Sequence, residues 1–429
     1  MGEMVATVTD YTDLKNRALI GSGYDGVVRV VANGYYGTGT LLFGGQAVLT
    51  AAHLFSRPEG LAFANTSVQF ETMWGIQSIG ASDVWVHPGY DGSDSLNDLA
   101  LVWLHQNAPA SAERFGLYRG QDEIGQPFTM LGFGVPGLGA SGMLTSFNQA
   151  PVRVIAQNQF DVDTAVLGSY FSTSGAWESI RGKQLAADFD NGLAQNDALG
   201  VMVQSKGLGL GELEGLITPG DSGGPAFING LLAGVASFSA RLSYRLSPNI
   251  LDATKSTGQA ASVSTDVDTQ ANSSYGEVAS WQRVSAYQQW IDQSLRVHDT
   301  LAPKSLSQVQ KSVPEGDSGT SLAYFWVQLN GARAGPNETV SLDYQTRSGT
   351  ALQGEDFLES KGTLKLYPGE NHALVAVEIL GDMQPEEDEY FYLDVFNPVG
   401  ASFDGGLVKL TAVRSILSDD GWIFSGGGY

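Results

Sequence analysis

The chain has no cysteine in its 429 residues, so no disulfide bond can hold its fold together and packing has to do so. Positive charge is also scarce. Only 23 Lys and Arg residues face 46 Asp and Glu residues, which gives a net charge of −23. A protein this acidic is repelled by nucleic acid and by anionic membrane surfaces, and we therefore expect neither as a partner.

Long apolar runs are absent as well. No segment approaches the ~20 consecutive apolar residues of a membrane-spanning helix, so we expect no membrane span. Residues 1–10 have neither the basic flank nor the apolar core of a signal peptide. We therefore find no signal peptide within this sequence.

Few stretches follow a helical pattern. The chain contains 54 glycines, and its apolar residues alternate with polar ones in short runs, which predicts a mostly β structure. At 429 residues the chain exceeds one ordinary hydrophobic core, so we expect two domains.

The chain does contain three short motifs that together provide the groups a serine nucleophile needs. Residues 220–225 read Gly-Asp-Ser-Gly-Gly-Pro, and these glycines permit a tight turn around Ser222. His53 and Asp98 each stand at one end of a short apolar run. A serine hydroxyl is a weak nucleophile and needs a base within hydrogen-bond reach, itself oriented by a third group. His53 and Asp98 are the candidates for these two roles.

The order His, Asp, Ser and the residues around each resemble the chymotrypsin-like (trypsin-fold) serine peptidases over roughly residues 19–296. This resemblance implies a two-barrel peptidase domain. It also implies that Ser222 attacks the scissile carbonyl, that His53 moves the proton and that a buried Asp98 orients the imidazole. The backbone N–H groups of Gly220 and Ser222 would form the oxyanion hole.

Residues 19–22, Leu-Ile-Gly-Ser, resemble the mature N-terminus of this family, which pairs with the aspartate beside the nucleophile once a pro-segment is cut away. The resemblance implies that residues 1–18 are a pro-segment and that the Leu19 amine pairs with Asp221. However, the residue before Leu19 is Ala18 rather than a basic residue. The alternative of an N-terminal arm on a constitutively active enzyme therefore stays open.

In this family the floor of the primary specificity pocket lies six residues before the nucleophile, which here is Leu216. The resemblance aligns the pocket walls with Ser239 and Ala279. It places Ser237 beside them, where the family hydrogen-bonds the catalytic aspartate. A basic side chain buried against Leu216 would lose its hydration without a partner, so we expect cleavage after small or medium apolar residues.

Two acidic stretches precede the nucleophile motif. Glu212 or Glu214 would favour basic substrate side chains if either pointed into the pocket. Asp188, Asp190 and Asp197 belong to an acidic turn that offers the oxygen ligands calcium prefers. For this turn a solvated loop without an ion is the favoured interpretation.

The peptidase domain is expected to end with a helix over residues 285–295, whose apolar residues recur at helical spacing. Beyond it, short alternating strands with glycine-containing turns predict an antiparallel, immunoglobulin-like sandwich of about seven strands. The expected division of the chain is 1–18 N-terminal arm or pro-segment, 19–298 peptidase domain, 299–311 linker, 312–420 sandwich and 421–429 tail.

The sandwich resembles a Calx-β domain over nearly all of residues 312–420, on motifs that include residues 313–316, 354–357, 386–391 and 416–420. That family holds calcium in acidic loops at one end of the sandwich. The resemblance implies calcium ligands at the matching positions: Glu315, Asp356, Asp382, Glu386, Asp419 and Asp420. Only Asp382 remains of the family's aspartate run after the fifth strand, so one bound calcium ion and an acidic rim without an ion both stay open.

The whole pattern predicts an all-β protein in which a serine endopeptidase, working through an acyl-enzyme, carries an accessory Calx-β sandwich. It needs no cofactor for catalysis. Family resemblance favours a bacterial protein that is secreted or lies at the cell surface or in the periplasm. We expect protein or peptide substrates, no nucleic-acid partner and a monomer. The alternative is an adhesin or binding protein whose peptidase-like barrel is inactive.

Overall fold

The computed structural model describes residues 5–57, 60–92, 96–145, 152–167, 180–205, 207–245, 262–268, 270–331, 333, 335 and 337–420. The chain divides into two compact units. The first comprises residues 1–42, 47–106 and 111–288, and the second comprises 43–46, 107–110 and 289–429. The predicted all-β class is confirmed, and no helix among the described residues is long and apolar enough to span a membrane. The expected tail, residues 421–429, lies outside the described residues.

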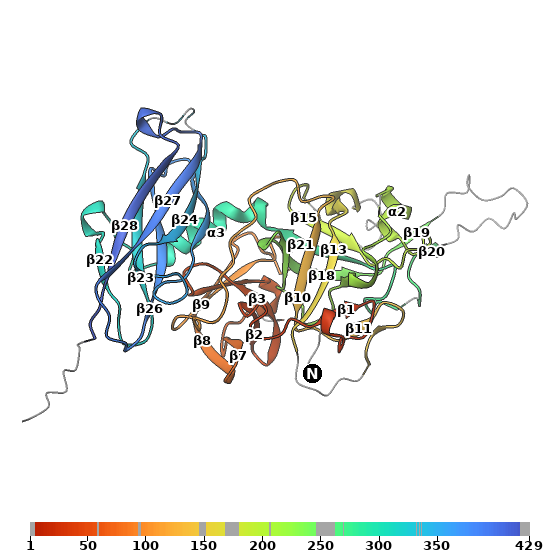
Figure 1. Ribbon diagram of the computed structural model, residues 1–429. Coiled ribbons are helices and arrows are strands. Elements are labelled where there is room, and N and C mark those ends of the chain that lie inside the picture. Colours follow the sequence, from red (N-terminus) through yellow and green to blue (C-terminus); the bar gives the residue numbers. More distant parts are fainter. Residues whose placement is uncertain are drawn as a thin grey trace, which may run out of the picture. The chain divides into compact units, whose positions relative to one another are not determined.

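Six strands of the first unit close a barrel in the order β2-β3-β4-β9-β8-β7 (Figure 1). These strands are β2 (Val27–Ala32), β3 (Tyr35–Leu41), β4 (Ala47–Thr50), β7 (Ser67–Thr72), β8 (Gly75–Val86) and β9 (Ala100–Leu104). β4 and β9 are buried along their whole length, as their apolar runs predict. They pair antiparallel with Thr50 opposite Ala100, so the end of β4 meets the start of β9.

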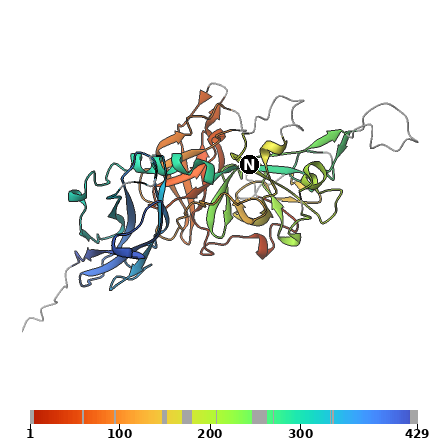
Figure 2. The ribbon, with the colours of Figure 1, turned by 90° about the horizontal axis from the view of Figure 1, so that it is seen from above.

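The first unit also contains a seven-stranded sheet in the order β13-β10-β17-β18-β21-β15-β14 (Figure 2). Its strands are β10 (Pro127–Gly132), β13 (Val154–Gln159), β14 (Val162–Asp163), β15 (Gln184–Asp188), β17 (Pro225–Ile228), β18 (Leu231–Ala240) and β21 (Val278–Arg283). Its core is aromatic: Phe128 stacks on Phe160 at 4.1 Å between ring centroids and meets Trp281 edge-on at 5.0 Å.

A strand close to the N-terminus belongs to this unit, although the sequence pattern predicted none there. β1 (Ala6–Thr7) runs between β11 (Gly137–Leu138) and β16 (Gly215–Leu216), and β12 (Gly142–Met143) completes a four-stranded sheet. Val5 and Ala6 are fully buried and pack in the same apolar core as Trp281. This part of the N-terminal segment is therefore built into the fold rather than frayed.

Short elements complete the first unit. They are the 3-10 helices η1 (Leu14–Asn16), η2 (Ala52–Phe55), η3 (Thr164–Leu167) and η4 (Gly211–Leu213), the helix α2 (Ala198–Val203), and the strands β5 (Ser56–Arg57), β6 (Gly60–Leu61), β19 (Ser243–Arg245) and β20 (Ser262–Ser264). The expected helix over residues 285–295 lies within α3 (Val284–His298).

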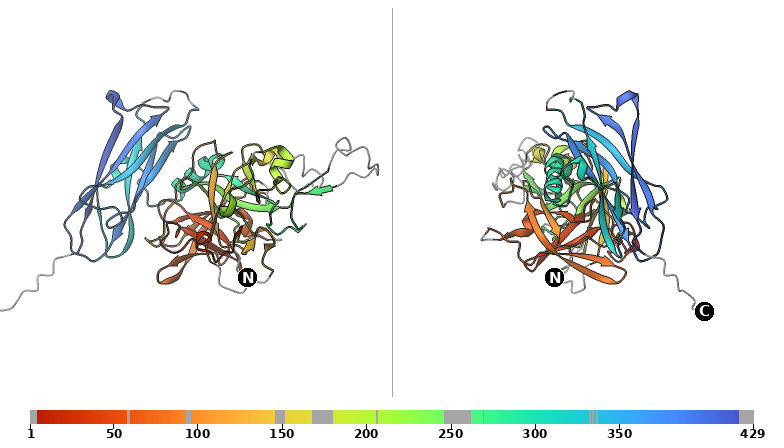
Figure 3. Two further views of the ribbon diagram at one scale, coloured as in Figure 1. Left: turned by 45° about the vertical axis from the view of Figure 1, so that its right-hand side comes forward. Right: turned by 90° about the vertical axis from the view of Figure 1, so that its left-hand side faces the viewer.

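The second unit is a sandwich of a five-stranded sheet, β22-β28-β27-β24-β25, and a two-stranded sheet, β23-β26 (Figure 3). Its elements are β22 (Ser312–Pro314), β23 (Gly319–Gln328), β24 (Val340–Ser348), β25 (Lys361–Leu366), β26 (His372–Gly381), β27 (Glu389–Val399) and β28 (Lys409–Leu417), with the 3-10 helices η5 (Leu306–Gln308) and η6 (Asp404–Gly406). Phe357 and Phe391 stack at 4.6 Å in its core. The predicted sandwich is confirmed.

Candidate active site

His53 and Asp98 meet because the strands beside them are paired. His53 lies in η2, directly after β4, and Asp98 stands just before β9. The Asp98 carboxylate accepts two hydrogen bonds from His53, one from the backbone N–H to Oδ1 and one from ring Nδ1 to Oδ2, both at 2.8 Å. A carboxylate can only accept, so Nδ1 carries the hydrogen and Nε2 is the acceptor of the neutral ring.

His53 and Asp98 differ in how far their side chains are buried. Asp98 is fully buried, whereas 19% of the His53 side chain is exposed. A third bond to Asp98 comes from Ser237 Oγ at 2.5 Å, and Ser237 accepts from Gln282 Nε2 at 3.4 Å. The Tyr287 hydroxyl donates to Gln282 Oε1 at 3.2 Å. Sequence analysis named Ser237 but missed Gln282 and Tyr287, because nothing in a strand glutamine or a helical tyrosine signals such a contact.

The Ser222 turn packs against the end of β4. A Cβ atom at Gly223 would lie 2.1 Å from Thr50 Oγ1 and 2.7 Å from the Ala51 nitrogen, so only glycine fits there. Gly223 also has a positive φ of 82°, which glycine adopts without strain. Ser222 immediately precedes Gly223 in the chain, and His53 follows Ala51 by two residues. The three predicted catalytic residues therefore belong to one neighbourhood.

The turn contains two backbone N–H groups of interest, those of Gly220 and Ser222. The Thr38 N–H donates to the Ser222 carbonyl at 2.8 Å, and Thr38 Oγ1 donates to the Gly220 carbonyl at 2.9 Å. Within the described parts of the chain, the N–H groups of Gly220 and Ser222 donate to no protein group. Free N–H groups in a fixed turn are what a developing oxyanion needs. Sequence analysis missed Thr38, which lies 182 residues away from Gly220 in the sequence.

Asp221 points away from solvent and is closely enclosed. Its Oδ1 accepts from the Gly134 N–H at 2.8 Å, and its Oδ2 accepts from the N–H and hydroxyl of Thr218 at 2.8 and 3.2 Å. A Cβ atom at Gly132 would lie 1.9 Å from Asp221 Oδ1. These contacts fix the carboxylate beside the nucleophile in the uncut chain.

Leu19 is not brought to Asp221 in the uncut chain. Leu19 is 50% exposed, whereas Asp221 is fully buried. The preceding residue, Ala18, donates its N–H to the Arg153 carbonyl at 3.1 Å, which fixes this segment at the start of β13. Pairing of Leu19 with Asp221 after cleavage stays a prediction, beside the alternative of an enzyme that needs no cleavage.

The predicted pocket residues lie on neighbouring strands. Leu216 and Ala279 are both fully buried and belong to one apolar cluster. Ser239 stands opposite Ala279 in the pairing of β18 with β21. Leu216 pairs with Ala6 of the N-terminal strand, a neighbour that the motif comparison did not foresee.

Glu212 and Glu214, the two carboxylates that could have made the pocket acidic, form contacts with other residues. Glu212 is exposed and pairs with Lys15 at 2.7 Å. Glu214 is buried, and its Oε1 accepts from the backbone N–H of Asp190 at 2.8 Å, while its Oε2 accepts from that of Leu210. These contacts remove the reason to expect a basic substrate side chain in the pocket.

Acidic side chains of the sandwich form two groups. In each, one oxygen per residue lies within 4.8 Å of the others: Glu315, Asp419 and Asp420 in one group, and Asp356, Glu386 and Glu389 in the other. Burial, followed by repulsion from Glu386, Asp382 and Asp356, raises the pKa of Glu315 to about 7. Asp382 belongs to neither group and accepts instead from the Gln384 N–H at 2.6 Å. Sequence analysis missed Glu389 as a member of the second group.

Family models match two segments of the chain. Residues 19–179 match the one described as Trypsin, and residues 305–419 match the one described as Calx-beta domain. The chain joins a trypsin-family domain to a Calx-beta domain. Both resemblances predicted from the motifs are thereby confirmed. The trypsin match includes His53 and Asp98, while Ser222 lies beyond its end.

The curated relatives include sodium/calcium exchangers. The sodium/calcium exchanger Calx of Drosophila melanogaster is 40% identical over 81 residues, and sodium/calcium exchanger 2 of Rattus norvegicus and Homo sapiens is 34% identical over 97 residues. These alignments cover 19–20% of this chain and only 8–10% of the exchangers. Among solved structures, the serine protease neuropsin of mouse brain matches with 16% identity and a TM-score of 0.44, covering 65% of this chain and 98% of neuropsin.

Proposed function

We propose that the trypsin-family domain is an active serine endopeptidase. The observation that carries this proposal is the buried Asp98 carboxylate bonded to His53 Nδ1, beside a glycine-bounded turn in which the N–H groups of Ser222 and Gly220 donate to no group among the described residues. A barrel kept only for adhesion or binding has no need of this arrangement, which disfavours the alternative of an inactive domain.

In the proposed reaction, His53 Nε2 removes the Ser222 hydroxyl proton as Oγ attacks the peptide carbonyl. The Gly220 and Ser222 N–H groups stabilise the negative charge that develops on the carbonyl oxygen. The proton then passes from His53 to the leaving amine, which departs and leaves an ester on Ser222. Water, deprotonated by His53, attacks this ester and regenerates the free serine. Asp98 stabilises the imidazolium throughout.

Ser222→Ala tests the proposal directly, because it removes only the hydroxyl. Peptide hydrolysis should fall about 10⁴-fold or more, and His53→Ala should have a similar effect. Both variants should keep the melting temperature of the parent protein within a few degrees. Substantial hydrolysis by Ser222→Ala would refute the assignment.

The substrate preference follows from the uncharged pocket residues. We propose cleavage after small or medium apolar side chains, with Leu216 at the floor and Ser239 and Ala279 in the walls. Digestion of a peptide library, read by mass spectrometry, would refute this if cleavage followed arginine or lysine. Secretion and a bacterial source stay predictions.

For the Calx-beta domain we propose binding of calcium. Its support is the likeness to sodium/calcium exchangers and the two groups of converging carboxylates. A bound ion would relieve the repulsion that acts on Glu315. The full chain should bind less calcium in equilibrium dialysis after Asp356→Asn, and equal binding would leave this domain without a calcium role.

A further inference from the structure

A third acidic group lies within the trypsin-family domain. Asp188 is the last residue of β15, Asp190 follows in the next loop, and Asp197 caps α2 through a hydrogen bond from the Gly200 N–H. One carboxylate oxygen from each of the three lies within 4.8 Å of the other two. We call Asp188, Asp190 and Asp197 the inner acidic cluster.

Asp190 indicates that this cluster holds a ligand. Only 7% of Asp190 is exposed, and its buried Oδ1 has no hydrogen-bond partner among the residues that the structure describes. A carboxylate oxygen that loses water without gaining a partner strongly destabilises a fold. Buried polar atoms in native proteins are otherwise nearly always bonded, to protein, water or an ion.

No positive side chain among the described residues forms an ion pair with the inner acidic cluster. Two further carboxylates, Asp161 and Glu214, add to its negative charge. Asp188 and Asp190 are both buried, so little water reaches these carboxyl groups.

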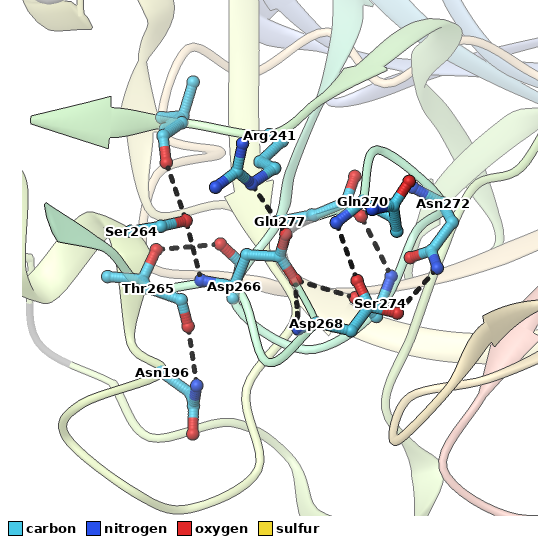
Figure 4. Close-up of polar contacts among 12 residues, drawn as sticks. Asn196, Arg241, Ser264, Thr265, Asp266, Asp268, Gln270, Asn272, Ser274 and Glu277 are labelled. Carbon is cyan, nitrogen blue, oxygen red and sulfur yellow. Dashed lines mark hydrogen bonds and ion pairs between the residues drawn. The ribbon is translucent and has the colours of Figure 1, made fainter. Parts of the chain in front are cut away.

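The neighbouring segment holds the loop in place without compensating its charge. Asn196 Nδ2 donates to the Thr265 carbonyl at 2.6 Å, which fixes the loop just before Asp197 (Figure 4). Arg241, the guanidinium of this region, pairs with Asp266 at 2.8 Å (Figure 4). Arg241 therefore forms its ion pair with Asp266 and not with the inner acidic cluster.

We propose that the inner acidic cluster binds a calcium ion through Asp188, Asp190 and Asp197. Calcium lies about 2.3–2.6 Å from its oxygen ligands, so two ligands of one ion are at most about 5.2 Å apart. The spread of up to 4.8 Å in the cluster falls within this limit. Magnesium requires near-ideal octahedral geometry and gives up its water reluctantly, so a site of three protein carboxylates suits it less well.

The ion would brace the strand that leads to the nucleophile turn. Asp190 donates its backbone N–H to Glu214 Oε1 at 2.8 Å, and Glu214 directly precedes β16. Asp188 Oδ2 accepts from the Leu199 N–H at 2.7 Å, which ties the end of β15 to α2. The site links β15, α2 and β16, and its role is to stabilise the domain rather than to take part in peptide hydrolysis.

The test uses the full chain in which Asp356→Asn and Asp419→Asn silence the two acidic groups of the Calx-beta domain. Equilibrium dialysis against radioactive calcium should give one bound ion per chain, and adding Asp190→Asn should abolish it. This double variant should also melt several degrees higher in millimolar calcium than in chelator, with a smaller gain in magnesium. Asp190→Asn should erase that gain.

Two further variants keep the test decisive. Asp197→Asn should weaken calcium affinity at least tenfold, even if Asp190→Asn fails to fold. Glu212→Gln, an exposed acid already paired with Lys15, should leave calcium binding unchanged. In chelator, Asp190→Asn should melt no lower than the parent, because the buried Oδ1 has no partner to lose among the described residues, whereas a purely structural aspartate would give a lower value. Undiminished calcium binding in both cluster variants, or a parent that binds no ion, would overturn the proposal.

Discussion

The position of Asp98 shows how a few buried hydrogen bonds prepare one side chain for proton transfer. His53 donates to it from both the backbone and the ring, and Ser237 donates from a distant strand. Each donor stabilises the carboxylate, and together they fix the plane in which the His53 ring lies. Gln282 and Tyr287 hold Ser237 in turn. Ser237 is therefore a positioning residue, which acts on the substrate only through Asp98 and His53.

Ser237→Ala should lower kcat without a matching change in KM, because the lost bond orients Asp98 and does not contact substrate. Removing a hydrogen bond to a charged group costs about 1.5–3 kcal/mol, which corresponds to a roughly 10- to 100-fold decrease in kcat. Steady-state kinetics on a peptide substrate measure this. Ser82→Ala, which removes a serine hydroxyl bonded to the Trp103 carbonyl at 3.2 Å, is the control and should keep kcat. Equal kcat in the Ser237 variant and the parent would contradict the positioning role.

Among the elements, β1 connects two segments that lie beside the nucleophile turn. It joins β11, which follows the Gly134 donor to Asp221, to β16, which precedes the Ser222 turn. The Val8 N–H donates to the Glu214 carbonyl at 3.3 Å, and the Gly139 N–H donates to the Thr7 carbonyl at 2.9 Å. This strand thus supports both segments that enclose Asp221 in the uncut chain.

Deleting residues 1–8 should destabilise the trypsin-family domain and lower its activity. Losing the buried Val5 and Ala6 side chains removes roughly 2–3 kcal/mol of apolar burial, and β16 loses its partner. Thermal melting and peptide hydrolysis measure the two effects. Deleting only residues 1–3, which leaves β1 intact, is the control. Higher activity after the longer deletion would instead indicate an inhibitory pro-segment.

In the Calx-beta domain, Asp394 on β27 ties neighbouring strands together. Burial opposes its ionisation, but hydrogen bonds from Thr411, Arg347 and Lys409 outweigh it and lower the pKa of Asp394 to about 2. An aspartate in an unfolded chain titrates near a pKa of about 3.9. The stabilisation is therefore present above about pH 4 and is lost as the pH falls towards about 2.

Asp394→Asn should accordingly lower the melting temperature of the sandwich at pH 7, and the difference from the parent should shrink as the pH approaches 2. Calorimetry across this range measures both. Glu359→Gln, which breaks the exposed pair with Lys361, is the control and should have little effect at any pH. A difference that stays constant with pH would show that Asp394 contributes through packing rather than charge.

The extent to which these elements could be predicted depends on how local their signals are. The glycine turn at Ser222, the apolar runs beside His53 and Asp98 and the alternating strands of the sandwich are readable in single stretches of sequence. The contacts of Thr38 and β1 are not, because each joins segments separated by more than a hundred residues, and the contact of Gln282 with Ser237 spans 45 residues. The Leu19 motif was read locally too, yet the uncut chain leaves Leu19 exposed, since its neighbours are fixed to β13.

At the scale of the whole molecule, the net charge of −23 is distributed unevenly. Two acidic groups lie in the Calx-beta domain and one in the trypsin-family domain, and each brings carboxylates within 4.8 Å. In a chain without cysteine, metal ions are an alternative means of stabilising a fold. The two proposed calcium roles share this physical basis, but each belongs to its own domain and is tested separately.

Covalent labelling of the full chain with a fluorophosphonate tests the central claim most directly. The reagent reacts only with a serine whose hydroxyl is activated by a correctly placed base, so folding alone does not produce a signal. We predict one adduct per chain, located at Ser222 by peptide mass spectrometry and absent from both Ser222→Ala and His53→Ala. A well-folded parent chain that gains no adduct, or gains it at another serine, would contradict the assignment of this domain as a serine endopeptidase.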